Sequence, residues 1–275
     1  MKILVNMSTI TYGGGLQASR SFVKYTLIKK HTDIVFHFII SSQLHAYLND
    51  LLTNISYSLV KVSPARLITG FHTRKYILDV ESDFSPDLTY SIGFPSYISF
   101  RSVEVGRYTN PWEIFSLTEA WSLLTPQEKI NRFLKSYIRR FYARRASFFE
   151  TQTIDAASAI SKTFNIPYSN IFVSPNVINP EFRTYNSLNK PISHPFQSES
   201  DNYSIFVLSA DHKHKNLTII PLVARLLKQL TSIPFTFNLT LPFESKTWKK
   251  IHSTIEISNI SNHIVNLGPL SLDQC

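Results

Sequence analysis

The sequence has only one cysteine, Cys275, and it stands at the last position. A single thiol cannot form an internal disulfide, and it cannot build a cysteine-based metal cage. Long apolar runs are also missing: the longest stretch, Ile34–Ile40, is interrupted by His37 and is far too short to span a bilayer. No apolar run of signal-peptide length follows Met1. These absences predict a protein that stays in the cytoplasm.

Acidic residues are scarce relative to basic ones. Asp and Glu number 19 against 28 Lys and Arg, which gives a formal net charge of +9 over 275 residues. Such an excess favours partners that carry phosphate, whether nucleic acid, anionic lipid or a small phosphorylated ligand. Because 43% of the residues are hydrophobic and 17% are charged, the composition is that of a globular chain rather than a disordered one.

The pattern of apolar residues predicts strands that alternate with helices. In the first part of the chain the predicted strands are residues 2–7, 33–41, 56–62, 87–92, 102–108, 147–153 and 171–174. Residues 183–202 are rich in Ser, Asn, Pro and His and predict a linker. Beyond it the predicted strands are 203–209, 235–241 and 263–267. This alternation predicts an α/β fold with two Rossmann-like parallel-sheet domains, residues 1–182 and 203–275.

The second predicted domain holds only three strands. Ser271–Gln274 has the form of a capping box that begins a helix, one residue before the last position. Because sheets have on average about five or six strands, we expect this domain to be incomplete. A small but complete second lobe is the alternative.

Three of the seven glycines, Gly13, Gly14 and Gly15, stand together between a predicted strand and a predicted helix. Glycine allows positive φ and a close approach of the backbone to a ligand, and the helix behind it offers unpaired N–H groups to an anion. Ala18 replaces the last glycine of the dinucleotide-binding fingerprint, which disfavours a dinucleotide site. We therefore expect contact with a phosphate or a sugar, and the alternative is a tight turn without a ligand.

A second strand-to-helix corner, residues 209–217, carries Lys213 and Lys215 among two histidines. Lysine supplies a point charge for phosphate oxygens, and a helix N-terminus adds partial positive charge. Asn216 is placed to cap the helix that follows. Asp211 is the only acidic neighbour of the histidines, so we expect no metal. The corner predicts an anion-binding site, with a solvated surface loop as the alternative.

Four short motifs follow one another along the chain. They are the strand–glycine–helix start at 13–15, Val173–Val177 followed by Phe182, His214–Leu217 after the predicted linker, and Leu267–Ser271. In this order they resemble the family-four glycosyltransferases of the GT-B type, over nearly the whole chain. The resemblance implies two Rossmann-like domains that face each other across a cleft. It also implies that the first domain mainly holds the acceptor and the second holds the nucleotide-sugar.

The resemblance also assigns roles to the residues that match its motifs. Gly14 and Gly15, next to Gly13, would approach the donor diphosphate or the sugar. Lys215, next to Asn216, would neutralise the diphosphate, with Lys213 near the usual arginine position. Fixed cations and helix N-termini stabilise a departing diphosphate without a metal ion. The nucleotide-sugar is then a substrate, and no cofactor is expected.

Two departures from the family pattern leave the catalytic residues unassigned. The paired glutamates Glu-x7-Glu that the family places late in its second domain are absent from this sequence. Many members also carry a histidine in the loop after the fifth strand, where this chain has Thr109–Trp112. In that loop Asn110 could hydrogen-bond a sugar and Trp112 could stack on one. A turn with a packed tryptophan is the alternative.

The helix predicted near mid-chain is strongly basic. Its basic residues are Lys129, Arg132, Lys135, Arg139, Arg140, Arg144 and Arg145. On a helical wheel most of them face away from a side that gathers Ile130, Leu134, Tyr137, Ile138 and Phe141. A basic amphipathic helix can rest on anionic lipid. Residues 129–145 therefore predict peripheral contact at the inner membrane face, and a solvated face of a domain helix is the alternative.

Together these features favour a glycosyltransferase of surface polysaccharide synthesis, of the kind that builds lipopolysaccharide. It would move a hexose from a nucleotide-diphosphate sugar to a glycan or lipid-linked acceptor, with retention at the anomeric carbon. The first alternative is a truncated, catalytically inactive relative that binds sugar nucleotides. Nucleic-acid binding is suggested by the charge and by the aromatic residues among Arg and Lys at 129–149, but no recognised nucleic-acid motif is present.

Overall fold

The computed structural model describes residues 1–29, 33–115, 119–122, 124–175, 202–212 and 215–270. Internal contacts divide the chain into two compact units: Met1–Leu117 with Pro126–Tyr185, and Thr118–Thr125 with Asn186–Cys275. Almost all of the predicted linker lies outside the described residues, as do Lys213 and the helix start predicted at 271–274.

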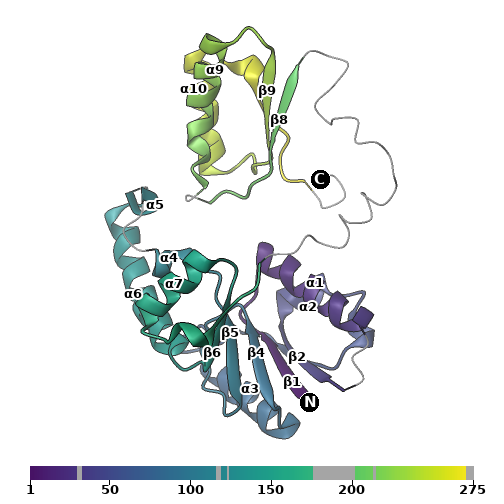
Figure 1. The fold of residues 1–275 in the computed structure, drawn as a ribbon. Coiled ribbons are helices and arrows are strands. Elements are labelled where there is room, and N and C mark those ends of the chain that lie inside the picture. Colours follow the sequence, from purple (N-terminus) through teal and green to yellow (C-terminus); the bar gives the residue numbers. More distant parts are fainter. Residues whose placement is uncertain (30–32, 116–118, 123, 176–201, 213–214, 271–275) are drawn as a thin grey trace. The chain divides into compact units, whose positions relative to one another are not determined.

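The first unit is built on a seven-stranded sheet in which all the described pairings are parallel. Its order is β3-β2-β1-β4-β5-β6-β7 (Figure 1). The strands are β1 (Lys2–Met7), β2 (Val35–Ser41), β3 (Tyr57–Val60), β4 (Leu88–Ile92), β5 (Val103–Arg107), β6 (Phe148–Thr151) and β7 (Ile171–Val173). The strand order reverses between β1 and β4. Open α/β sheets bind their ligands at the carboxyl ends of the strands near such a point.

Helices pack on both faces of this sheet. The helices of this unit are α1 (Gly14–Lys29), α2 (Ser42–Tyr47), α3 (Phe71–Phe84), α4 (Pro111–Ile114), α6 (Pro126–Ala143) and α7 (Ile154–Phe164). The short helix α5 (Glu119–Ser122) is grouped with the second unit. Neighbouring residues of a strand point to opposite faces. Val5 accordingly joins a core with Val23 of α1, whereas Leu4 joins a separate core with Ile77 of α3. A third core around Phe149 joins β6 to α6 and α7.

The second unit has a three-stranded parallel sheet in the order β10-β9-β8. Its elements are β8 (Tyr203–Val207), α9 (Ile220–Leu230), β9 (Phe235–Leu239), α10 (Lys246–Ser258) and β10 (Ile264–Asn266). Both helices lie on the same side of the sheet (Figure 1). Phe237 and Leu239 of β9 share a core there with Ala224 of α9 and Ile251 of α10. Short 3-10 turns complete the two units: η1 (Leu52–Asn54), η2 (Tyr168–Asn170), η4 (Leu217–Ile219) and η5 (Ser261–His263).

The helix predicted from Asn216 begins later than expected. The turn η4 comes first, and α9 begins at Ile220 with Pro221 in its first turn, where a missing N–H costs nothing. Asn216 has a left-handed φ of 46°, and its side chain makes no capping hydrogen bond. The prediction that Asn216 caps the following helix is therefore wrong.

Within the described ranges, the structure has no helix that is both long and apolar enough to cross a membrane.

Candidate functional site

The glycine turn follows β1 at the carboxyl edge of the seven-stranded sheet. Gly13 has a φ of +63°, a left-handed conformation that glycine adopts without strain. Its carbonyl accepts a hydrogen bond from the N–H of Leu16 at 3.0 Å. Gly14 and Gly15 are already the first two residues of α1. The turn therefore ends at Gly13, and the next two glycines carry the first N–H groups of the helix.

Two hydroxyl groups fix the main chain in front of this turn. Ser41, at the end of β2, donates to the carbonyl of Ile10, and Thr9 donates to the carbonyl of Gly93, just after β4. Gly93 has a φ of +88°, and a Cβ there would lie 2.7 Å from atoms of both Ile10 and Thr9. Because β2 and β4 flank β1, the loop is held from both sides. Sequence analysis did not identify these contacts, since no local pattern links residues so far apart.

The glycines border open space. A Cβ added to Gly13 or Gly14 would meet no heavy atom within 4 Å, whereas one added to Gly15 would approach Ile10 Cγ2 at 3.2 Å. N–H groups at the start of a helix attract anions. The main chain at Gly13 and Gly14 is thus open to a phosphate or a sugar, while binding itself stays a prediction.

A buried polar network links β1, β4 and β5. Asn6 accepts hydrogen bonds from the hydroxyl of Ser8 at 2.7 Å and from its N–H at 3.1 Å, and it donates to Ser91 at 3.4 Å. Ser91 in turn donates to Glu104 Oε1 at 2.6 Å. Burial raises the pKa of Glu104 to about 7, against the lowering effect of hydrogen bonds from Ser91 and Ser96. A glutamate between two valines of a predicted strand was the available signal for this group.

The loop after β5 contains the two residues predicted to contact a sugar. Asn110 begins α4, because its side-chain oxygen accepts a hydrogen bond from the N–H of Trp112 at 3.1 Å. The guanidinium of Arg132 lies 3.9 Å from the centroid of the Trp112 ring. One face of this indole is thus occupied by an arginine. Sugar contact by Asn110 and Trp112 stays a prediction.

Beside them stands a buried carboxylate that sequence analysis missed. Glu113 accepts hydrogen bonds from Tyr108 at 2.7 Å and from Arg139 of α6 at 2.6 Å, and its main-chain carbonyl accepts one from Arg140 at 3.1 Å. Burial raises the pKa of Tyr108, and the nearby Glu113 raises it further. Burial opposes the charge of Arg139, but Glu113 and Tyr97 more than offset this and raise its pKa. The cluster fixes α6 against the loop after β5.

The second predicted corner leaves the carboxyl end of β8. The N–H of His212 donates to the carbonyl of Ala210 at 2.8 Å, and the N–H of Lys215 donates to the carbonyl of His212 at 2.9 Å. The side chain of Lys215 is exposed. Because η4 separates Lys215 from α9, the positive end of the helix dipole lies farther from Lys215 than it would if the helix began at Asn216. The dipole therefore adds less to the attraction of an anion here.

Side chains tie the loops at this edge together. Asn266, the last residue of β10, accepts from the N–H groups of Leu241 at 3.0 Å and Gly268 at 3.3 Å, and it donates to the carbonyl of Leu241 at 3.0 Å. Thr240 accepts from the N–H of Ser209 at 3.2 Å. The loops after β8, β9 and β10 leave the same edge of a parallel sheet, and these bonds join them in one layer.

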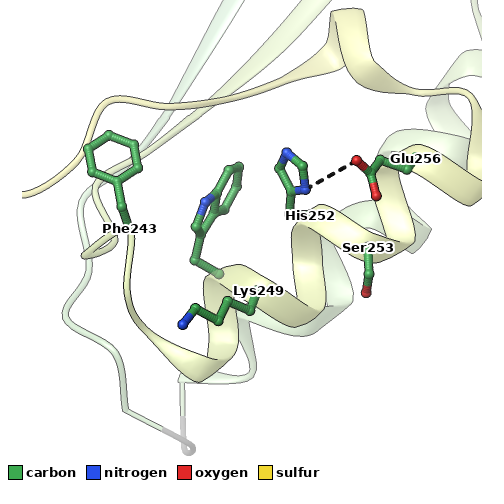
Figure 2. A pocket seen from close by; sticks show the side chains of 6 residues that line it. Phe243, Lys249, His252, Ser253 and Glu256 are labelled. Carbon is green, nitrogen blue, oxygen red and sulfur yellow. Dashed lines mark ion pairs between the residues drawn. The ribbon is translucent and has the colours of Figure 1, made fainter.

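A shallow groove of about 260 Å³ lies beside α10 in the second unit. It is lined by Phe243, Trp248, Lys249, His252, Ser253 and Glu256 (Figure 2). His252 Nδ1 lies 3.6 Å from Glu256 Oε1, and the rings of Trp248 and His252 meet edge to face with 5.5 Å between their centroids. The groove contains none of the residues predicted to bind the donor.

The predicted donor contacts fall in both units. Gly13, Gly14 and Gly15 belong to the first unit, and Lys215 and Asn216 belong to the second. That they grip one pyrophosphate together stays a prediction. Among the described residues, no group of three or more His, Cys, Asp or Glu side chains is arranged to hold a metal ion.

No family model matches the sequence, and no curated protein matches it. Solved structures do match. A glycosyltransferase from Rickettsia africae ESF-5 has a TM-score of 0.63 at 12% identity, over 98% of this chain and 68% of that one. HepE from Anabaena, in complex with UDP and glucose, has a TM-score of 0.59 at 13% identity, over 98% and 70%. UDP-GlcNAc 2-epimerase from Neisseria meningitidis, bound to UDP-GlcNAc, has a TM-score of 0.59 at 18% identity, over 99% and 73%.

These similarities establish the class of fold. The chain has a GT-B-like α/β architecture, with a seven-stranded parallel sheet in one unit and a smaller parallel sheet in the other. The fold predicted from the sequence is thereby confirmed. Transferases and epimerases both carry this fold, so it does not separate one activity from the other.

Proposed function

We propose that this protein binds a uridine diphosphate sugar and transfers its sugar to an acceptor. The glycine turn carries the proposal: it lies where the strand order reverses, it is held on both sides by Ser41 and Thr9, and it leaves open space at Gly13 and Gly14. A site for a diphosphate needs this combination of a fixed backbone and free approach. The fold is shared with proteins whose structures hold UDP and glucose or UDP-GlcNAc.

The chemistry explains why cations and helix ends would suffice. Transfer breaks the bond between the anomeric carbon and a diphosphate oxygen, and it forms a bond from that carbon to an acceptor hydroxyl, which loses its proton. Negative charge develops on the departing UDP. The first N–H groups of α1 and the ammonium groups of Lys215 and Lys213 would stabilise that charge without a metal ion. We assign no catalytic acid or base.

The finer parts of the proposal rest on the resemblance between the ordered motifs and family-four enzymes. We propose a hexose as the transferred sugar, retention at the anomeric carbon, and a glycan or lipid-linked acceptor in surface polysaccharide synthesis. Each of these is separate from nucleotide binding and needs its own test.

Two other functions share the proposed site. A UDP-sugar 2-epimerase is one, because the Neisseria epimerase has the same fold at the highest identity of the three structures compared. An inactive sugar-nucleotide binder is the other, because no residue of this sequence has been assigned a catalytic role. Incubation with UDP-GlcNAc and no acceptor identifies an epimerase, because only an epimerase produces the 2-epimer under these conditions. A transferase forms its product only when an acceptor is added, and an inactive binder forms none in either case.

The direct test of the site is stabilisation by nucleotide. Thermal unfolding of the full chain should shift upward with UDP and with UDP-sugars, because a ligand present at about 100 times its Kd adds about 2.7 kcal/mol to the free energy of unfolding. Lys215→Ala should lower UDP affinity at least about tenfold, since it removes a positive charge proposed to lie beside the diphosphate. Lys250→Ala is the matched control, because Lys250 is an exposed lysine on α10 of the same unit.

The control variant should shift with UDP as the wild type does. A wild-type chain that unfolds at the same temperature with and without every common sugar nucleotide would refute the proposal. Equal losses of affinity in the Lys215 and Lys250 variants would show that net charge, rather than this corner, attracts the nucleotide.

A further inference from the structure

Helix α6 turns an apolar stripe toward solvent. Five large side chains at helical spacing, between 54% and 73% exposed, form the stripe: Ile130, Phe133, Leu134, Tyr137 and Phe141. The helical wheel drawn from the sequence has four of these five on one side together with Ile138, which is only partly exposed in the structure. Only Ser136 and Ala143 of this helix are buried. The apolar side of α6 is thus its outer side.

The inner side of α6 is held by arginines. Arg139 donates to the buried carboxylate of Glu113 at 2.6 Å, and Arg140 donates to the main-chain carbonyl of Glu113 at 3.1 Å. Arg132 lies over the ring of Trp112 at 3.9 Å. A rotation of the helix that buried the stripe would break these contacts and leave Glu113 without its charged partner. The outward position of the stripe is therefore fixed by specific bonds.

This arrangement is the reverse of an ordinary surface helix, which buries its apolar stripe and exposes its charges. Large contiguous apolar patches are rare on soluble monomers, and they mark sites of contact with proteins or membranes. The five exposed side chains of α6 run along the helix from its first turns to its last. The stripe therefore has the form of a contact surface.

Exposed cations on α6 and just beyond its end identify the partner. Lys129, Lys135, Arg144 and Arg145 are exposed along α6 and just beyond its end. The guanidinium of Arg145 lies 4.6 Å from the ring centroid of Phe141, so cation and apolar surface adjoin. An apolar stripe bordered by cations is complementary to a bilayer of anionic lipid, in which the side chains enter the acyl boundary and the cations meet the headgroups.

We infer that α6 is a membrane-docking surface that lies in the plane of an anionic bilayer, with its apolar stripe inserted at the headgroup boundary. This inference goes beyond nucleotide binding and does not depend on it. It also gives a physical reason for part of the excess positive charge, since each Lys or Arg near an anionic surface adds attraction.

Vesicle flotation with the full chain tests the inference. The wild type should float with phosphatidylglycerol vesicles at low salt, and it should bind phosphatidylcholine vesicles and high-salt phosphatidylglycerol samples several-fold more weakly, because the charge interaction is lost or screened. The double substitution Phe133→Ser with Tyr137→Ser should lower the bound fraction about tenfold or more, since it removes two inserted rings. Both residues are exposed, so the fold should not change.

The matched control is Ile68→Ser with Phe71→Ser, which removes two exposed apolar side chains elsewhere in the first unit and should leave flotation unchanged. The inference is overturned if the wild type stays in the bottom fraction of the gradient, or if the double variant floats as the wild type does. It is also overturned if the wild type is a dimer in solution that the α6 substitutions convert to a monomer. Stabilisation by UDP, measured on the same samples, reports separately on the nucleotide site.

Discussion

The hydroxyl of Ser41 donates a hydrogen bond to the main-chain carbonyl of Ile10. The same oxygen accepts a hydrogen bond from the N–H of Leu44 at 3.2 Å, at the start of α2. One side chain thus joins the end of β2, the beginning of a helix and the loop before the glycine turn. The turn is therefore held in place by hydrogen bonds within the protein itself.

The two glycines at the turn should respond differently to alanine. Gly14→Ala should leave the free energy of unfolding unchanged or raise it by about 0.5 kcal/mol, because its Cβ meets nothing and alanine favours the helix. UDP affinity should nevertheless fall at least about tenfold, since the methyl group would occupy the space proposed for the diphosphate. Gly13→Ala should cost about 1–2 kcal/mol because of its left-handed φ. Urea unfolding and UDP titration measure both effects, and a Gly14→Ala chain that binds UDP normally would contradict the site.

Glu104 should make stability depend on pH. Its pKa is raised from 4.5 to about 7 in the folded state, so the folded chain keeps a proton that the unfolded chain loses between these values. The free energy of unfolding should therefore fall, by about 3 kcal/mol, as the pH rises from about 4.5 to 7. Glu104→Gln should remove this part of the slope in urea titrations across that range. Glu244→Gln, with a side chain 91% exposed, is the control and should keep the wild-type slope.

Glu113→Gln should destabilise the first unit by about 1–3 kcal/mol, because it leaves the half-buried guanidinium of Arg139 without its negative partner. A double-mutant cycle with Arg139→Gln measures the coupling between the two side chains. Arg20 and Asp50 form a pair with the same 2.6 Å separation, but the carboxylate of Asp50 is exposed, so Asp50→Asn should cost less stability than Glu113→Gln. Equal costs for the two pairs would show that burial adds nothing to the contact at Glu113.

Asn266→Ala should loosen the edge of the second unit. It removes both acceptor contacts to the N–H groups of Leu241 and Gly268. Amide hydrogen exchange at Leu241 should therefore accelerate at least about tenfold, which corresponds to about 1.4 kcal/mol of local stability. Amides in the middle of β9 provide the internal reference, and a uniform acceleration there would indicate unfolding of the unit as a whole.

Local patterns were enough to predict much of the fold. The alternation of strands and helices was correct, and the strand predicted at residues 2–7 has these bounds in the structure. The alternation does not predict where an element begins or ends when a single residue sets that boundary. At Asn216, the proline at position 221 sets the start of α9, and the residues before it close into a 3-10 turn.

The candidate site was predictable only where it is local in sequence. The glycines at 13–15 mark a strand-to-helix turn by composition alone, but the contacts of Ser41 and Thr9 that hold it depend on strand order. Helix α6 shows the same limit. Its wheel identifies which residues share a side, yet Glu113, on another helix, decides which side faces the protein.

In the part of the chain that the structure describes, β8 pairs with β9 alone. Its other edge offers main-chain donors and acceptors to any extended strand that meets it, including a strand of a second molecule. Residues 202–270 expressed alone would therefore risk edge-to-edge aggregation. The exposed side chains of Tyr203 and Phe206 in this strand, and of Leu208 just beyond it, would add to the attraction. Binding studies of the second unit are better made on the intact chain.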